Sequence, residues 1–151
     1  MSATTEVHQC VERYYQSLRT SSADGVRSVF HPNARVTGYL PDGLHEMTVD
    51  DFAGFVQDQQ PSPDEAGADR MLEILSCEVA GETASVRIRE AYLGMVFVDT
   101  FGMLRVDGEW LIYSKLFHVE DLTWRVCADD RLMVTRRRRT VLTASDRGAP
   151  A

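Results

Sequence analysis

Residues 71–118 read MLEILSCEVA GETASVRIRE AYLGMVFVDT FGMLRVDGEW LIYSKLFH. Apolar and polar side chains alternate through this stretch with a period of two, which is typical of half-buried β-strands. Three breaks divide it, at Gly81-Glu82, at Gly94 and at Asp107-Gly108, and Asp-Gly is a strong hairpin signal. We therefore predict four consecutive antiparallel strands, over residues 71–80, 83–93, 95–106 and 109–118.

Helical periodicity marks the N-terminal part of the chain. In residues 5–20, apolar side chains recur at three- and four-residue spacing, which predicts an amphipathic helix capped by Thr4 or Thr5. A shorter helix is expected over residues 26–30. It ends there because the residue before Pro32 disfavours helical backbone.

A strand, a third helix and a loop are expected before the four strands. Residues 34–40 read as a strand, and Thr48 with Asp51 three residues later forms a near capping box for the helix. Residues 60–69 contain two prolines and a glycine, so we expect a loop in a position to cover a pocket. Helices followed by an antiparallel meander indicate one α+β domain over residues 1–118.

Composition excludes several functional classes. The net charge of −7 argues against general nucleic-acid binding. No apolar run reaches the roughly 18 residues of a membrane span, and the polar first residues lack a signal-peptide pattern, so we expect a cytoplasmic protein without membrane contact. Cys10, Cys77 and Cys127 lack metal-binding spacing and are expected to be buried free thiols.

The last part of the chain has a different composition. Residues 119–151 are rich in arginine and include the run Arg136–Arg139. We expect a C-terminal extension that is partly extended, solvated around this run and flexible at its end.

Several short motifs, taken in order, resemble the nuclear-transport-factor-2-like superfamily. The opening motifs are Tyr14-Tyr15, Gly25, Phe30–Ala34 and Gly38-Tyr39, and the closing ones are Phe97–Asp99, Val106–Trp110 and Lys115–His118. Together they are most similar to the lumazine-binding branch. The resemblance covers about residues 5–118. It implies a cone in which three N-terminal helices pack on a strongly bent antiparallel sheet around a pocket, with frequent homodimers through the outer face.

The resemblance extends to the steroid isomerases of this superfamily and implies two hydrogen-bond donors for a developing enolate. Tyr14 matches the tyrosine of the first helix, and Asp99 matches a strand aspartic acid that stays protonated in an apolar site. By strand alternation, Asp99 shares a face with Phe97 and Phe101. The alternative is that Tyr14 is a core tyrosine and Asp99 a structural residue bonded to backbone or to an arginine.

One position departs from the isomerase pattern. Gly38 stands where those enzymes carry the aspartate base. Asp42, His45, Glu90 and His118 are candidate replacements, and we expect His118, at the end of the last strand, to be the general base or acid. Glu90 shares a face with apolar neighbours, which suits a pocket unless a register slip turns it outward.

The expected catalytic residues are therefore Tyr14, Asp99, His118 and Glu90. The expected ligand contacts are the apolar and aromatic side chains of Tyr39, Phe52, Phe55, Met95, Phe97, Phe101 and Leu116. The sequence contains no glycine-rich phosphate loop, hydrolase elbow or metal motif. We expect no cofactor and no metal.

These observations favour a cofactor-independent lyase, isomerase or cyclase. It would act by acid–base chemistry on a small, hydrophobic, oxygenated metabolite of polyketide type. The alternative is a non-catalytic module of the same fold that binds a small molecule or serves as a dimeric interaction domain, because the fold alone does not select a function.

Overall fold

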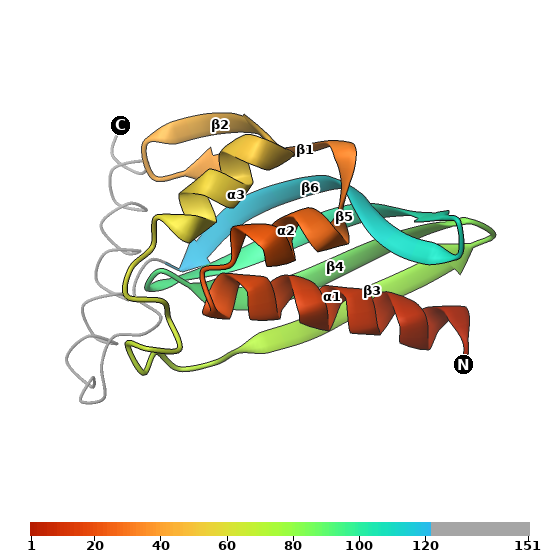
Figure 1. Cartoon of the computed structure of the whole chain (residues 1–151), viewed down its shortest axis with the longest axis horizontal. Coiled ribbons are helices and arrows are strands. Elements are labelled where there is room, and N and C mark those ends of the chain that lie inside the picture. The colour runs from red at the N-terminus through yellow and green to blue at the C-terminus, as the bar shows by residue number, and fades with distance from the viewer. Residues whose placement is uncertain (122–151) are drawn as a thin grey trace, which may run out of the picture.

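Three helices pack on the concave face of one curved, six-stranded sheet (Figure 1). The structure is a computed structural model and describes residues 1–121. The helices are α1 (Ala3–Arg19), α2 (Ala23–Val29) and α3 (Val49–Gln57). The strands are β1 (Phe30–Leu40), β2 (Gly43–Thr48), β3 (Leu72–Ala80), β4 (Thr83–Tyr92), β5 (Met95–Val106) and β6 (Glu109–Asp121). This arrangement confirms the predicted α+β class.

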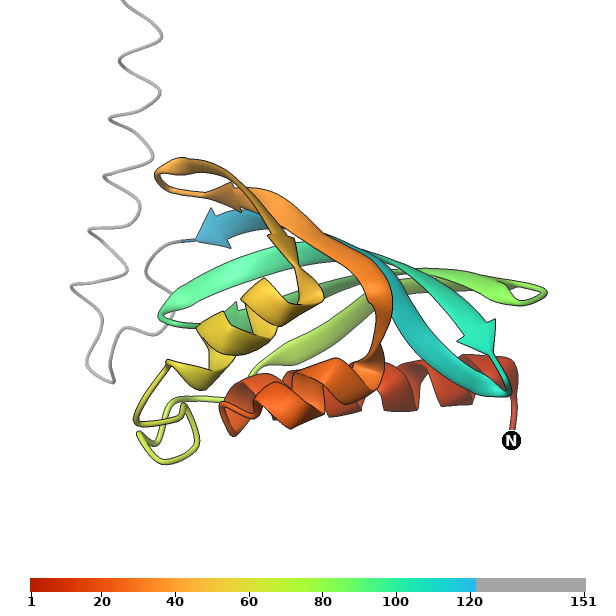
Figure 2. The same cartoon turned by 45° about the horizontal axis from the view of Figure 1, so that its top comes forward.

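The strands follow the order β2-β1-β6-β5-β4-β3. Strands β3 to β6 form the predicted antiparallel meander, but β1 pairs with β6 in parallel. The sheet is therefore mixed, and the expectation of a purely antiparallel sheet is wrong. Figure 2 shows α1 and α2 beneath the sheet, while α3 and the tip of the β1–β2 hairpin lie at the end away from the N-terminus and give the domain a conical shape.

Strand β2 was not predicted. Its six residues lie between a turn and a helix cap, and such a short segment carries little periodicity of its own. It forms because it pairs antiparallel with the edge of β1, from Arg35↔Thr48 to Leu40↔Gly43. The hairpin carries His45 to the open end of the cone.

Side chains next to the first residues of α1 and α3 cap these helices. Ser2 caps α1 in place of the expected Thr4 or Thr5, and its hydroxyl accepts a hydrogen bond from the Thr5 amide at 3.1 Å. The capping box of α3 is confirmed. The Thr48 hydroxyl accepts from the Asp51 amide, and the Asp51 carboxylate accepts from the Thr48 amide, each at 3.1 Å.

A β-bulge divides β6 into two halves that face differently. Met103 pairs with Ile112 and Gly102 pairs with Ser114, so Tyr113 is an extra residue opposite β5. Trp110 and Ile112 point inward before the bulge, and Lys115 and Phe117 point inward after it. The alternation of β6 therefore shifts by one residue at Tyr113.

The loop between α3 and β3 is confirmed as irregular, and it is fastened to the end of α1. Asp64 lies 2.7 Å from the Arg19 guanidinium, and the Asp64 amide donates to the Arg19 carbonyl at 3.0 Å.

The expected Cys10 thiol is buried, and Cys77 is half-buried. No helix within residues 1–121 is long and apolar enough to cross a membrane. The expectations for Cys127 and the arginine run lie outside the described residues.

Gly38 is needed where β1 meets β6. A Cβ atom at this position would lie 2.1 Å from the Phe117 carbonyl oxygen and 2.5 Å from Cγ of its ring. We predict that Gly38→Ala lowers the free energy of unfolding by about 1–3 kcal/mol, because the two strand backbones must move apart. Chemical denaturation of the two proteins measures the change.

Gly54→Ala is the matched control. Gly54 lies on the exposed side of α3, and a Cβ atom there meets nothing within 4 Å. Alanine should leave stability unchanged or raise it by up to about 1 kcal/mol, because it favours helix. Equal effects of the two substitutions would show that the Gly38–Phe117 contact is not tight.

Candidate functional site

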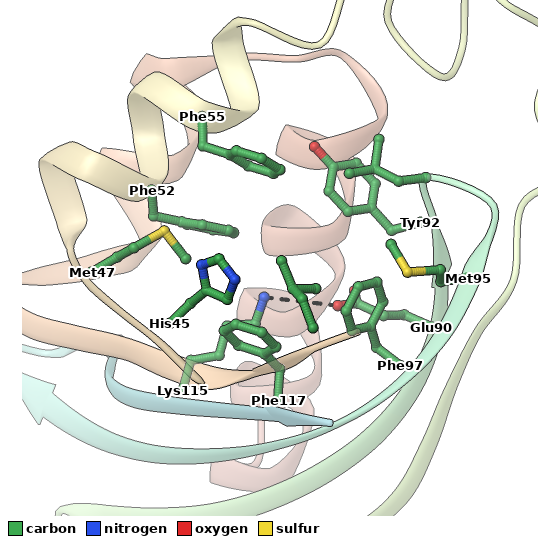
Figure 3. Close-up of a pocket in the computed structure, with 12 residues that line it drawn as sticks. His45, Met47, Phe52, Phe55, Glu90, Tyr92, Met95, Phe97, Lys115 and Phe117 are labelled. Atoms are coloured by element: carbon green, nitrogen blue, oxygen red, sulfur yellow. Dashed lines mark ion pairs between the residues drawn. The ribbon is translucent and has the colours of Figure 1, made fainter. Parts of the chain in front are cut away.

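A cavity of about 250 Å³ lies between α3 and the inner face of the sheet, at the open end of the cone (Figure 3). Most of its wall is aromatic or thioether, contributed by Phe52, Phe55, Phe97, Phe117, Met47 and Met95. Only a few polar side chains reach it, namely His45, Glu90, Tyr92 and Lys115. An apolar wall with a few convergent polar groups is the usual form of a small-molecule site.

The cavity includes five of the residues expected at the site. Phe52 and Phe55 come from α3, Glu90 from β4, and Met95 and Phe97 from β5. Phe101 faces inward as expected, but it is fully buried in the core and does not line this cavity. The loop expected to cover the pocket contributes no lining residue.

Three expected residues face away from the cavity. Tyr39 and Leu116 are 57% and 55% exposed, and His118 is exposed on the same outer face. None of the three lines this cavity, although each was expected at the site. Leu116 and His118 point outward because the bulge at Tyr113 shifts the alternation of β6, and Tyr39 does so because its neighbour Gly38 holds the inward position of β1.

A buried polar cluster underlies the cavity wall. The Tyr14 hydroxyl lies 2.7 Å from Glu90 Oε2, to which it donates, and 3.4 Å from Asp99 Oδ2. Lys115 Nζ lies 3.9 Å from Glu90 Oε2 and 3.8 Å from Asp99 Oδ2. We call Tyr14, Glu90, Asp99 and Lys115 the polar cluster. Glu90 and Lys115 line the cavity, while Tyr14 and Asp99 lie behind them.

Tyr14 and Asp99 therefore do converge, as expected, but they do not face the cavity. The two side chains meet beneath the wall, and Glu90 and Lys115 stand at the positions that a ligand can touch. Oε1 of Glu90 and Oδ1 of Asp99 have no hydrogen-bond partner within residues 1–121. Such unpaired buried oxygens are costly in a fold without a further role.

Lys115 is a charged residue of the site that was not predicted from the sequence, and neither were Met47, Tyr92 and Phe117 of the cavity wall. Its ammonium lies 4.5 Å from the ring centre of Phe52, 5.0 Å from that of Tyr14 and 5.5 Å from that of Phe117. Cation–π attraction to these rings stabilises the charge. The available signal was that this is the single lysine of the sequence, with Leu116 and Phe117 beside it, but the bulge that turns it inward has no sequence signature in Leu111–Phe117.

Burial controls the protonation of Glu90. Desolvation, followed by the negative charge of Asp99, raises the pKa of Glu90 well above its ordinary value. Burial and the charge of Glu90 also raise the pKa of the Tyr14 phenol. Burial therefore favours the protonated forms of both the Glu90 carboxyl and the Tyr14 phenol.

The isomerase base has no counterpart at Gly38, because Phe117 fills the space that a side chain there would need. His45 approaches the cavity from β2 instead. Its Nε2 lies 2.7 Å from Asp42 Oδ1, so the carboxylate orients the ring at the mouth. Within the described part of the chain, no group of three or more His, Cys, Asp or Glu side chains is arranged to hold a metal ion.

The raised pKa of Glu90 predicts a pH-dependent stability. The folded state holds a proton that the unfolded chain releases above about pH 4.5, so the free energy of unfolding falls as pH rises toward the folded pKa. One such proton contributes up to about 1.4 kcal/mol per pH unit. Glu90→Gln, which carries no titrating proton, should flatten this slope in denaturation measured between about pH 5 and 8.

Glu78→Gln is the control for that measurement, since Glu78 is exposed on β3. It should leave the slope of the parent chain unchanged. If Glu90→Gln leaves the slope of the free energy of unfolding against pH as it is in the parent chain, Glu90 is ionised in the folded protein.

Comparisons with known proteins agree with this architecture. A structure described as an NTF2-like protein of unknown function from Silicibacter pomeroyi superposes with a TM-score of 0.72 at 23% identity, covering 80% of this chain and all of that one. One from Shewanella baltica gives 0.66 at 25% identity, covering 80% of this chain and 98% of the other. A protein named aldolase FrzH, from Cladobotryum sp., is 23% identical over 105 residues, which are 70% of this chain and 82% of its own length.

The family comparison covers most of the described domain. The model of the family described as "Putative lumazine-binding" matches residues 2–118, which include every element from α1 to β5 and most of β6. The chain therefore belongs to this family within the NTF2-like superfamily.

Proposed function

We propose that the chain is a cofactor-independent enzyme that moves protons next to a carbonyl group. The observation that carries this proposal is the position of the Glu90 carboxyl, whose pKa burial raises, 3.9 Å from the Lys115 amine on one wall of an apolar cavity. A carbonyl oxygen that reaches this wall would meet two donors in a site of low dielectric. Such donors stabilise the negative charge of an enolate far better than water does.

Each polar side chain has a distinct part in the proposal. Glu90 and Lys115 hold the carbonyl oxygen, and Glu90 is the acid that protonates it. Tyr14 and Asp99 are positioning residues that fix Glu90 and Lys115 from behind. His45, oriented by Asp42, replaces His118 as the proposed base that removes the proton from the neighbouring carbon.

Enolate formation is the step shared by isomerases, aldol-type lyases and many cyclases. The relative named an aldolase supports the lyase branch of this proposal. The cavity is slightly smaller than the roughly 300–1,000 Å³ common for ligand pockets, and its wall is apolar. A small, hydrophobic aldehyde or ketone, such as a polyketide-like metabolite, is therefore the proposed class of substrate.

Deuterium exchange tests this function without knowledge of the natural substrate. Cyclohexanone in D₂O, followed by NMR, should exchange its α-protons faster in the presence of the chain. His45→Gln and Glu90→Gln should each lower the enzymatic rate by about 10²–10⁴-fold, because each removes a proton-transfer group.

His118→Gln provides the matched control. It also replaces a histidine, one on the strand that pairs with the β1–β2 hairpin, but its side chain is exposed on the outer face. Its exchange rate should equal that of the parent chain. Exchange lost in His118→Gln and kept in His45→Gln would reverse the proposed base, and no exchange by the parent chain would count against the function.

A second candidate is a non-catalytic ligand-binding module that dimerises. The apolar cavity wall and the family description favour binding, and the exposed apolar side chains of Tyr39 and Leu116 on the outer face favour a homodimer. In that case, calorimetry should give the same affinity for an apolar ligand before and after Asp99→Asn. Light scattering should report twice the chain mass. A monomer whose affinity falls with Asp99→Asn would contradict this candidate.

A further inference from the structure

Lys115 has an unusual combination of properties. It is the only lysine in the 151 residues, and only 5% of its surface is exposed. Figure 3 shows its side chain rising from β6 into the middle of the cavity, with the amine directed toward Glu90. A compact amine in an apolar cavity is the setting in which lysine acts as a nucleophile toward carbonyl compounds.

The Lys115 amine is not held by short polar contacts. Within residues 1–121, Lys115 forms no hydrogen bond, and its two carboxyl contacts are ion pairs at 3.8 and 3.9 Å. A structural buried lysine is normally held by short, directional bonds, because the cost of desolvation must be offset. Here the nitrogen keeps room for a new bond.

The polar cluster also gives the amine a route to its neutral form. The nearer oxygen of the Asp99 carboxyl lies 3.8 Å from the Lys115 nitrogen, where it could receive a proton from it. Transfer of one proton from Lys115 to Asp99 would leave an amine and two carboxylic acids. An amine and two carboxylic acids carry no charge, so this arrangement avoids the desolvation cost of a buried ion pair.

We propose that Lys115 is a nucleophile that forms a Schiff base with an aldehyde or ketone bound in the cavity. This inference rests on the carbonyl substrate of the proposed function. In the proposed function, Lys115 only polarises the carbonyl oxygen of the substrate. In this inference, Lys115 forms a covalent intermediate with the carbonyl carbon.

The step is balanced without a cofactor. The amine lone pair forms a C–N bond to the carbonyl carbon, and the carbonyl oxygen takes a proton from Glu90. The nitrogen, now positively charged, returns one of its protons to the Glu90 carboxylate and so regains a lone pair. The hydroxyl then takes the proton held on Asp99 and leaves as water while that lone pair forms the C=N bond, so the ammonium and the carbonyl become a protonated iminium and one water.

The groups around the Lys115 nitrogen suit a protonated iminium. The protonated iminium keeps its positive charge on the nitrogen that now faces Asp99 and the rings of Tyr14 and Phe52. These groups would stabilise the iminium as they stabilise the ammonium. The iminium in turn withdraws electrons from the adjacent C–H or C–C bond, which is the bond that enolisation or an aldol cleavage must break.

Reductive trapping tests the inference. The full chain is incubated with cyclohexanone and sodium cyanoborohydride near neutral pH, then analysed by intact mass and tryptic digestion. Because no other lysine exists, one added cyclohexyl group and loss of tryptic cleavage after residue 115 identify the site. We expect labelling at Lys115 to be about tenfold or more faster than in the denaturant-unfolded chain or at the N-terminal amine.

Lys115→Arg keeps a cation beside the carboxylates and should show labelling only at the N-terminus. The comparison of native and unfolded parent chains holds even where a variant folds poorly. If Lys115 of the native chain is labelled no faster than Lys115 of the unfolded chain, its role as a nucleophile is wrong. The proposed function would still stand if the native chain exchanges α-protons. Fast labelling without exchange would retain the nucleophile and overturn the proposed proton transfer.

Discussion

The β-bulge at Tyr113 decides which side chains of β6 reach the cavity. One additional residue between the pairs Gly102↔Ser114 and Met103↔Ile112 moves Lys115 and Phe117 to the inner face. Phe117 then fills the space beside Gly38, and Lys115 meets Glu90 and Asp99. Without the bulge, Leu116 and His118 would face inward, and the cavity would contain an imidazole in place of an amine.

The chemistry of the site follows from enclosing these groups among aromatic rings. Two carboxyl groups and one ammonium cannot all remain charged at low cost in an apolar interior, so the pKa of Glu90 is raised and its protonated form is favoured. The phenol of Tyr14 holds the carboxyl in place, and the rings of Phe52 and Phe117 face the ammonium. The result is an acid and a cation side by side at the wall of a small cavity.

This arrangement differs from the steroid-isomerase pattern that the sequence resembles. There, a tyrosine and an aspartic acid face the ligand, and an aspartate on the first strand is the base. Here Tyr14 and Asp99 lie one layer deeper, Glu90 and Lys115 stand in front of them, and Gly38 leaves its space to Phe117. The shared fold thus presents a different set of groups to the cavity.

The sequence by itself determined the elements and most of their faces. Strand alternation placed Glu90 and Asp99 on inner faces, and the Asp-Gly turn and the Thr48 capping box marked element ends, because these signals depend on residues only a few positions apart. Phe52, Phe55, Met95 and Phe97 were predicted for the same reason.

Only the tertiary structure decided the parallel pairing of β1 with β6, the short strand β2, and the bulge at Tyr113. Each depends on hydrogen bonds to a strand distant in the sequence, and a one-residue shift of register reverses every face that follows it. That is why Lys115 was not predicted at the cavity, and why His118 and Leu116 were.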